Sequence, residues 1–235
     1  MATTYLTRTQ TAGNRKIWTF SAWVKRSSTA GTKLISAGSG SGNCTFIGFD
    51  TNKLAIESLT SSLTKTQLIT ERRFRDPAAW YHIVVGYDST PATPSTSSIY
   101  VYINGVKQTS FSHETYPSQN EDSHFNTTVD VRVGSDAYAS QYYFDGVMAH
   151  VHLTDGTAYA ATAFGETDAT SGIWIAKSGP SVTYGTNGFF LKFASGALGT
   201  DSSGEGNNMT VSGTMTNTKD TPDNNFATIN PLDDY

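Results

Sequence analysis

The sequence predicts an all-β protein folded as an antiparallel β-sandwich, and three observations lead to that class. Apolar and polar residues alternate along many short segments, as in strands with one buried face. Turn-forming residues separate these segments, and helical periodicity is scarce. The chain has 235 residues, 37% of them hydrophobic, and sandwiches of about 200–250 residues commonly form one domain. We therefore expect a single domain with a full core.

The first expected strands lie between residues 18 and 57. Apolar side chains alternate with polar ones in Trp18–Val24, but Trp23 interrupts the polar series. We therefore expect the second face of this strand to be partly covered. The segments Thr45–Phe49 and Lys53–Glu57 flank the short polar joint Asp50–Asn52. Because Asp and Asn tolerate left-handed backbone angles, this joint predicts a hairpin turn.

Two further segments are expected near the centre of the sandwich. Trp80–Tyr87 alternates strongly, and the Ser-, Thr- and Pro-rich stretch Asp88–Ser98 must be a loop. Ile99–Ile103 places aliphatic residues on one side and tyrosines on the other. Asn104-Gly105 then predicts a type I′ hairpin turn, which needs positive φ at both positions.

The remaining strands are predicted at residues 129–133, 147–153, 188–193 and 209–211, while 157–164 has the composition of one or two helical turns. From residue 158 onward the chain is richer in Gly, Asn, Asp and Thr, and its periodicity is weaker. We therefore expect residues 1–157 to form the sandwich core. Residues 158–235 are expected to be a loop-rich extension packed on the same domain that can supply a last strand.

Composition excludes several classes of protein. The net charge is −4 and the densest basic run is only Glu71–Arg75, which argues against a nucleic-acid-binding surface. Cys44 is the only cysteine, so no intrachain disulfide is expected. The first residues contain no apolar run, and no stretch approaches the ~18 apolar residues of a membrane span. These features predict a protein made in a reducing cytosol.

No catalytic pattern is present in the sequence, so we expect no enzyme. Retaining glycosidases need two carboxylates about 5–5.5 Å apart, and here no two glutamates lie at strand spacing. The glutamates are Glu57, Glu71, Glu114, Glu121, Glu166 and Glu205. A nucleophile elbow of the Gly-x-Ser-x-Gly form is also missing.

Histidines offer one alternative. His150 and His152 are two residues apart, a spacing that on a regular strand puts both rings on one face, as a zinc site can use. A third ligand would have to come from His82 or Asp145 through tertiary structure. The simpler interpretation is that the pair lies on the outward face and that His82 is a structural histidine.

Three segments carry a family resemblance: Phe20–Val24, Trp80–Asp88 and Tyr100–Gly105. They resemble the laminin-G-like branch of the concanavalin A-like lectin/glucanase superfamily, and Phe144–Met148 is similar to the stretch before the closing strand of that family. Order and spacing match over roughly residues 15–155. The resemblance implies a concanavalin A-like jelly roll.

The C-terminal third resembles segments of structural proteins from tailed phages that infect marine bacteria. These segments are Phe164–Trp174, Tyr184–Phe189, Asp201–Gly204 and Asn225–Pro231. The likeness implies a virion component. In laminin-G-like relatives an Asp-x-Ser-Gly-Asn-Gly-Asn loop follows the first strand, whereas here it follows residues 189–193 and has Glu205 in place of the first Asn. We infer that residues 189–193 replace that strand by circular permutation or pair with a neighbouring copy.

Calcium is the metal that the resemblance implies, because laminin-G-like relatives often bind it at the sandwich rim. Calcium takes six to eight oxygen ligands, which loops can supply. The candidate ligands lie at predicted strand ends: Asp50, Asp88, Asn104, Asp136 and Asp145. The alternative is ordinary turn chemistry, so no cofactor is required.

Tyrosines are the candidates for ligand or partner contact, since a tyrosine joins an apolar body to a polar tip. The candidates are Tyr100, Tyr102, Tyr138, Tyr142 and Tyr143. Tyr100 and Tyr102 can equally form cross-strand pairs that stabilise a sheet face. The loop Ala137–Tyr143 is therefore the preferred contact segment.

The sequence thus predicts a non-enzymatic virion structural protein on the phage surface, either a capsid decoration protein or a tail or fibre component. It would act through protein–protein contacts as a homo-oligomer, with possible binding of host-cell glycans, after assembly in the bacterial cytoplasm. The alternative is a free-standing carbohydrate-binding lectin module assisted by calcium. A hydrolase is a distant third.

Overall fold

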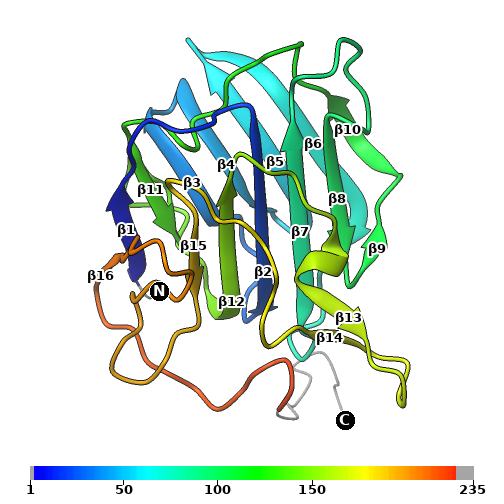
Figure 1. The fold of residues 1–235 in the computed structure, drawn as a ribbon, viewed down its shortest axis with the longest axis vertical. Coiled ribbons are helices and arrows are strands. Elements are labelled where there is room, and N and C mark those ends of the chain that lie inside the picture. The colour runs from blue at the N-terminus through cyan, green and yellow to red at the C-terminus, as the bar shows by residue number, and fades with distance from the viewer. Residues whose placement is uncertain (1–2, 226–235) are drawn as a thin grey trace.

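The computed structural model describes residues 3–225. Two antiparallel sheets pack face to face (Figure 1), which confirms the predicted β-sandwich. The larger sheet has eight strands in the order β10-β6-β5-β4-β3-β11-β1-β16. Their bounds in that order are Phe111–Thr115, Leu63–Arg73, Lys53–Thr60, Asn43–Asp50, Thr32–Gly40, Asp130–Val133, Tyr5–Thr9 and Thr210–Ser212.

The smaller sheet has six strands in the order β15-β12-β2-β7-β8-β9. Their bounds are Phe189–Leu191, Gly146–Asp155, Ile17–Arg26, Tyr81–Asp88, Ile99–Ile103 and Val106–Lys107. Outside both sheets lie a 3-10 turn, η1 (Ala161–Ala163), and a short hairpin of β13 (Gly165–Thr167) and β14 (Trp174–Ala176). The expected helical turns over residues 157–164 are thus reduced to η1.

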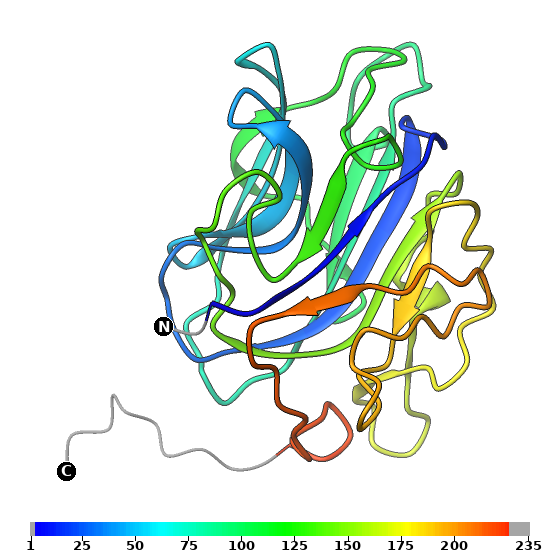
Figure 2. The same ribbon diagram turned by 90° about the vertical axis from the view of Figure 1, so that its left-hand side faces the viewer.

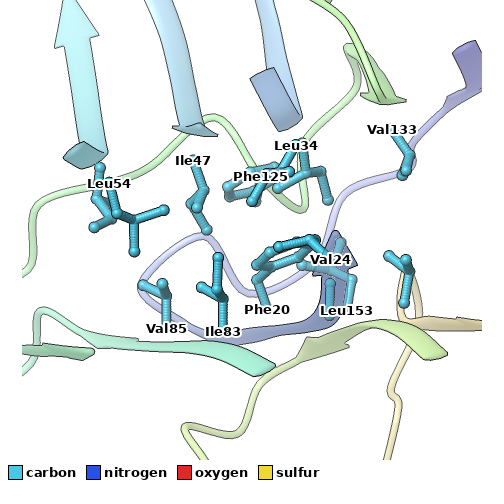
Figure 3. Packing of buried hydrophobic residues seen from close by; sticks show 14 of the residues in the cluster. Phe20, Val24, Leu34, Ile47, Leu54, Ile83, Val85, Phe125, Val133 and Leu153 are labelled. Carbon is cyan, nitrogen blue, oxygen red and sulfur yellow. The ribbon is translucent and has the colours of Figure 1, made fainter. Parts of the chain in front are cut away.

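The core fills the space between the two sheets. Alternate residues of each strand point inward from both layers and meet in one continuous apolar cluster (Figure 3). Trp18 lies flat on Tyr87, with ring centroids 5.0 Å apart, and meets the edge of Phe125 at 4.8 Å. Burying one large apolar side chain contributes roughly 1.5–3 kcal/mol. The alternation observed in the sequence is therefore the main source of stability.

The predicted turns form as the local chemistry requires. Asn104 and Gly105 have φ values of 50° and 78°, the signs that a type I′ turn needs. Thr51 in the joint between β4 and β5 also has a positive φ, 54°, and the two strands pair directly on either side of it.

β15 lies at the edge of the six-stranded sheet. Leu191 pairs with Val151 of β12 in the same chain. The following loop is organised by Asp201, whose carboxylate accepts backbone hydrogen bonds from Phe190, Ser203 and Asn207 at 2.8–2.9 Å. Glu205 lies in this loop without a role in that hydrogen bonding: the turn is fixed by Asp201.

The segment after β12 covers the outer face of the six-stranded sheet (Figure 2, yellow). Trp23 is accordingly only 4% exposed, so the expected partial cover of its face is present. His82 stacks between Trp23 and Trp174, with ring centroids 4.8 and 6.0 Å away. Phe164 and Ala161 bury Val84 beside it. On the eight-stranded sheet, the loop after β11 covers part of the outer face: the carbonyl of Tyr142 accepts the backbone N–H of Lys33 at 2.8 Å, and Phe46 is only 9% exposed.

Within residues 3–225, no helix has the length and apolar character needed to cross a membrane.

Candidate ligand-binding site

A pocket of about 200 Å³ opens on the outer face of the eight-stranded sheet. It spans strands β3, β4 and β5, which lie side by side in that sheet (Figure 1). The lining residues are Gly31, Lys33, Phe46, Phe49, Asp50, Ala55, Glu57 and Tyr142. Two kinds of group therefore face one space: aromatic rings, and charged side chains of both signs.

Strand register brings the charged groups to this pocket. Glu57 of β5 lies directly opposite Phe46 of β4, and Lys33 of β3 lies opposite Gly48 of β4. A Cβ atom at Gly48 would come within 2.2 Å of the carbonyl oxygen of Thr32 and 3.2 Å of Cδ of Lys33. Only glycine therefore leaves room for the lysine stem to cross β4.

The loop Ala137–Tyr143 forms the outer wall of the pocket and is held firmly. The backbone N–H of Lys33 donates to the carbonyl of Tyr142 at 2.8 Å. Arg132 donates from its guanidinium to the carbonyls of Asp136 and Ala139. Tyr142 adopts a φ of 51° and is 49% exposed. A left-handed conformation is costly for a bulky residue and is often found where a side chain is held for a function.

Lys33 lies between the two rings of the pocket. Its ammonium nitrogen, Nζ, is 2.9 Å from the ring centroid of Phe46 and 5.2 Å from that of Tyr142. Burial lowers the pKa of Lys33 to about 8, although the carboxylates of Asp136 and Glu57 act in the opposite direction. A cation on an aromatic face is attracted by the ring quadrupole, so the ammonium is positioned rather than free to rotate.

The predicted contact tyrosines are divided between the two sheets. Tyr142 lines the pocket. Burial raises the pKa of Tyr138, and the nearby carboxylate of Asp136 raises it further. The ring of Tyr143 is tilted against that of Tyr5, with centroids 6.3 Å apart. Tyr100 and Tyr102 lie on β8 in the other sheet, with their rings 5.8 Å apart. Among the candidate tyrosines, Tyr142 is the one that lines the pocket.

The candidate calcium ligands are dispersed. Asp50 lines the pocket, and the buried Asp136 accepts a hydrogen bond from Gln141 at 3.0 Å. Asp88 caps the following turn at Thr90, whereas Asn104 accepts the backbone N–H of His82. Asp145 is exposed at the start of β12. Residues 3–225 contain no cluster of three or more His, Cys, Asp or Glu residues that could hold a metal ion.

The two histidines of β12 do not lie on a regular strand. A bulge between Ala149 and His152 gives His150 a φ of 48°. His152 is buried under the extension, stacked on Phe190 at 4.0 Å and bonded to the hydroxyl of Tyr184 at 2.9 Å. His152 lies on the face away from the main core, as expected, but it is buried there because the extension covers it.

Sequence reasoning missed Lys33, Phe46 and Glu57 as site residues. Lys33 is on β3, which was not predicted, because Ser and Gly dilute its alternation. Phe46 and Glu57 are on predicted strands, but their meeting depends on the β4–β5 register. The Asp50–Asn52 turn was the available signal, since a tight turn fixes which residues oppose each other.

A second cavity of about 300 Å³ lies at the open side of the sandwich, between β1 and β12. Its apolar lining includes Leu6, Phe144, Met148, Phe193 and Met215. Several of these side chains also pack against the main core.

Comparison with known proteins agrees with the geometry. Residues 2–163 match the laminin G-type family of the concanavalin A-like lectin/glucanases superfamily. The chain belongs to this family. The predicted resemblance is therefore confirmed, and no curated protein sequence matches.

Several solved structures are similar to this chain. The SAP-like pentraxin of Limulus polyphemus is 13% identical with a TM-score of 0.51, over 76% of this chain and 87% of that one. The enzymatically active domain of tailspike protein 2 from bacteriophage CBA120 is 17% identical over 68% of this chain and 25% of that one, with a TM-score of 0.48. Domains LG4-5 of the mouse laminin α1 chain are 7% identical over 80% and 44%, with a TM-score of 0.46. At 13% identity the likeness to the pentraxin concerns the fold alone.

Proposed function

We propose that this protein is a non-catalytic glycan-binding module whose sugar binds in the pocket of Lys33, Phe46, Glu57 and Tyr142. The observation that carries the proposal is the half-exposed ring of Tyr142, held by its backbone beside a positioned ammonium. The laminin G-type fold supports a binding role. A concave site with an apolar surface and a few convergent polar groups is the usual form of a small-ligand site.

The chemistry of the pocket suits a sugar ring. The apolar face of a sugar can stack on the Tyr142 ring, because an aromatic side chain offers a large apolar surface. The carboxylates of Asp50 and Glu57 can accept hydrogen bonds from hydroxyl groups, and Lys33 can donate to sugar oxygens. Hydrogen bonds that involve a charged group are about twice as strong as neutral ones.

The two carboxylates of the pocket come from neighbouring strands. Glu57 is on β5 opposite Phe46, and Asp50 is four positions further along β4. The pair therefore lacks the same-strand spacing that would set two carboxylates about 5–5.5 Å apart, as retaining glycosidases need. This supports binding without catalysis.

The wider setting that we propose is the surface of a phage particle, as a capsid decoration protein or a tail or fibre component. Support comes from the C-terminal segments that resemble structural proteins of tailed phages. In that setting the pocket would attach the particle to host-cell glycans. The alternative, a free-standing lectin module, would use the same pocket.

A glycan array with the purified protein tests the binding role. We expect Tyr142→Ala to abolish signals that the wild type gives, while Tyr142→Phe, which keeps the ring, retains them. Both variants change the same half-exposed side chain and keep the backbone carbonyl that binds Lys33, so a difference in binding between them reports on the ring. Equal binding by wild type and Tyr142→Ala would reject the pocket as the site.

The setting is tested separately by the mass of the protein in solution, measured by light scattering after size exclusion, and by immunogold labelling of phage particles. A stable oligomer together with labelled particles supports the virion role. A monomer and unlabelled particles would favour the free-standing module.

A further inference from the structure

The ammonium group of Lys33 lacks hydrogen-bond and ion-pair partners among the residues that the structure describes. Among residues 3–225, no carboxylate oxygen lies within 4.0 Å of its Nζ atom, and no hydrogen-bond acceptor contacts it. Lys25, which is buried, is by contrast paired with Asp220 at 2.9 Å. An ammonium has three N–H donors, and those of Lys33, a partly exposed residue that rests on the ring of Phe46, are open to a ligand. No carboxylate of residues 3–225 compensates the charge of Lys33 at contact distance.

The position of Lys33 is set by its surroundings. Its stem passes over Gly48, its Nζ rests on the ring of Phe46, and its backbone N–H binds Tyr142. The group is thus oriented before any ligand arrives. Burial lowers the pKa of Lys33 by more than the nearby carboxylates raise it. This is expected when the carboxylates are too far from Nζ to form ion pairs. A preorganised donor gains affinity because little freedom is lost on binding.

From this geometry we propose that the ligand is an acidic sugar whose anionic group pairs with Lys33 while its ring stacks on Tyr142. The inference rests on the proposed glycan-binding function and names its substrate class. An anion in contact with Nζ is attracted at short range. The carboxylates of Glu57 and Asp50 lie beyond 4.0 Å from Nζ, and Asp50 is exposed to screening water.

Asp50 and Glu57 restrict the ligand further. Because they are hydrogen-bond acceptors when ionised, they favour a ligand that also carries hydroxyl donors. A simple inorganic anion has no such donors and would meet only repulsion from them. The pocket therefore selects a polyhydroxylated anion, which is the chemistry of sialylated, uronic or sulfated sugars.

The test is calorimetry with three ligands that share one core: lactose, sialyllactose and lactose sulfate. We expect at least one acidic ligand to bind about tenfold more tightly than lactose at pH 7, the effect of one hydrogen bond to a charged group. Comparing sialyllactose with lactose sulfate shows whether a carboxylate or a sulfate is preferred. Raising the pH from 7 to 9.5 should reduce this preference, since Lys33 loses its charge near pH 8.

Two variants make the assignment specific. Lys33→Met keeps the stem on Phe46 but removes the charge, and it should lose the preference, so that the acidic ligands bind no more tightly than lactose. Lys33→Arg should retain the preference. Glu57→Gln, which removes a repelling charge, should strengthen binding of the acidic ligands and not of lactose.

The outcomes separate the two proposals. Failure of all three ligands to bind the wild type would contradict the glycan-binding function itself. Equal or tighter binding of lactose would overturn the acidic-sugar inference and leave the function standing. An acidic preference that survives in Lys33→Met would also overturn the inference, since the anion would then bind elsewhere.

Discussion

The two outer faces of the sandwich differ in how they treat their titratable groups. On the six-stranded sheet, the buried His82 has both ring nitrogens engaged: Trp174 donates to Nδ1 at 2.9 Å, and Nε2 lies 2.9 Å from the hydroxyl of Ser21. On the eight-stranded sheet, the partly exposed Lys33 rests on Phe46 without an acceptor among the described residues. The extension seals the first face, whereas the loop Ala137–Tyr143 leaves a pocket on the second.

This difference supports the proposed assignment of binding to the eight-stranded sheet and of a structural role to the outer face of the six-stranded sheet. A buried polar group that has all its partners adds rigidity, while one that lacks a partner costs stability. Proteins keep such costs mainly at functional sites. Four predictions follow from this contrast, from the largest expected effect to the smallest.

Acid should destabilise the sealed face. Burial lowers the pKa of His82 to about 3, so the unfolded state binds a proton between pH 6.5 and 3 that the folded state does not. Stability is therefore complete above pH 6.5 and falls as the pH drops, by about 4–5 kcal/mol at pH 3 for this group. Because Trp174 donates to Nδ1, a proton there would also break that hydrogen bond.

Urea unfolding across pH 3–7 measures this loss. His82→Gln should reduce the loss, although its stability at pH 7 is lower because two hydrogen bonds change. Part of the loss remains, because burial also lowers the pKa values of His152 and His124. An equal loss in wild type and His82→Gln would show that His82 is not a responsible group.

Removing an aromatic ring should affect the two faces very differently. Phe164 is buried and packs on Val84 and on the ring of His152, so Phe164→Ala should cost about 3–5 kcal/mol. Tyr142 is 49% exposed, so Tyr142→Ala should cost within about 1 kcal/mol. Denaturant midpoints of the two variants compare them directly. Similar losses would mean that the aromatic loop is also a structural element.

Raising the pH into the alkaline range should stabilise the folded protein, because Lys33 loses its charge there. Its folded-state pKa of about 8 is below the unfolded value of 10.5, so the folded state releases its proton first. The penalty for burying the charge is present below pH 8 and is relieved as the pH rises toward 10.5, a gain of about 2–3 kcal/mol. Lys33→Met should lack this gain. The measurement is the difference in unfolding free energy between wild type and variant at pH 7.5 and 10.

The sequence predicted the sealed face better than the face with the pocket. Trp23 broke the alternation of its strand and so indicated a cover, and the Asn104-Gly105 turn was predicted with its backbone signs. By contrast, β3 contains Ser and Gly at several positions and β6 contains Thr and charged residues, so neither gave a clear period. The pocket needs β3 beside β4, so it could not be assembled from local patterns.

Tyr142 also shows why the pocket could not be predicted from local sequence patterns. Its loop was predicted as a contact segment from composition, but its partner Lys33 is 109 positions away in the chain (142 − 33). Their contact arises because β3 pairs with β11, which leads into the loop. Long-range pairing of this kind is decided by the whole core and leaves no trace in short stretches of sequence.

Removing calcium should have the smallest effect. A calcium site needs six to eight oxygens around one point, yet the candidate ligands serve separate turns. Asp88 binds the N–H of Thr90, Asn104 binds that of His82, and Asp136 accepts from Gln141. We expect the melting temperature in EDTA to equal that in millimolar calcium within about 1 °C, because ligand binding would raise it by mass action. A rise of several degrees with calcium would instead show that these loops assemble a site, and Asp136→Asn would then be the first variant to measure, since one carboxylate oxygen of Asp136 is buried without a partner.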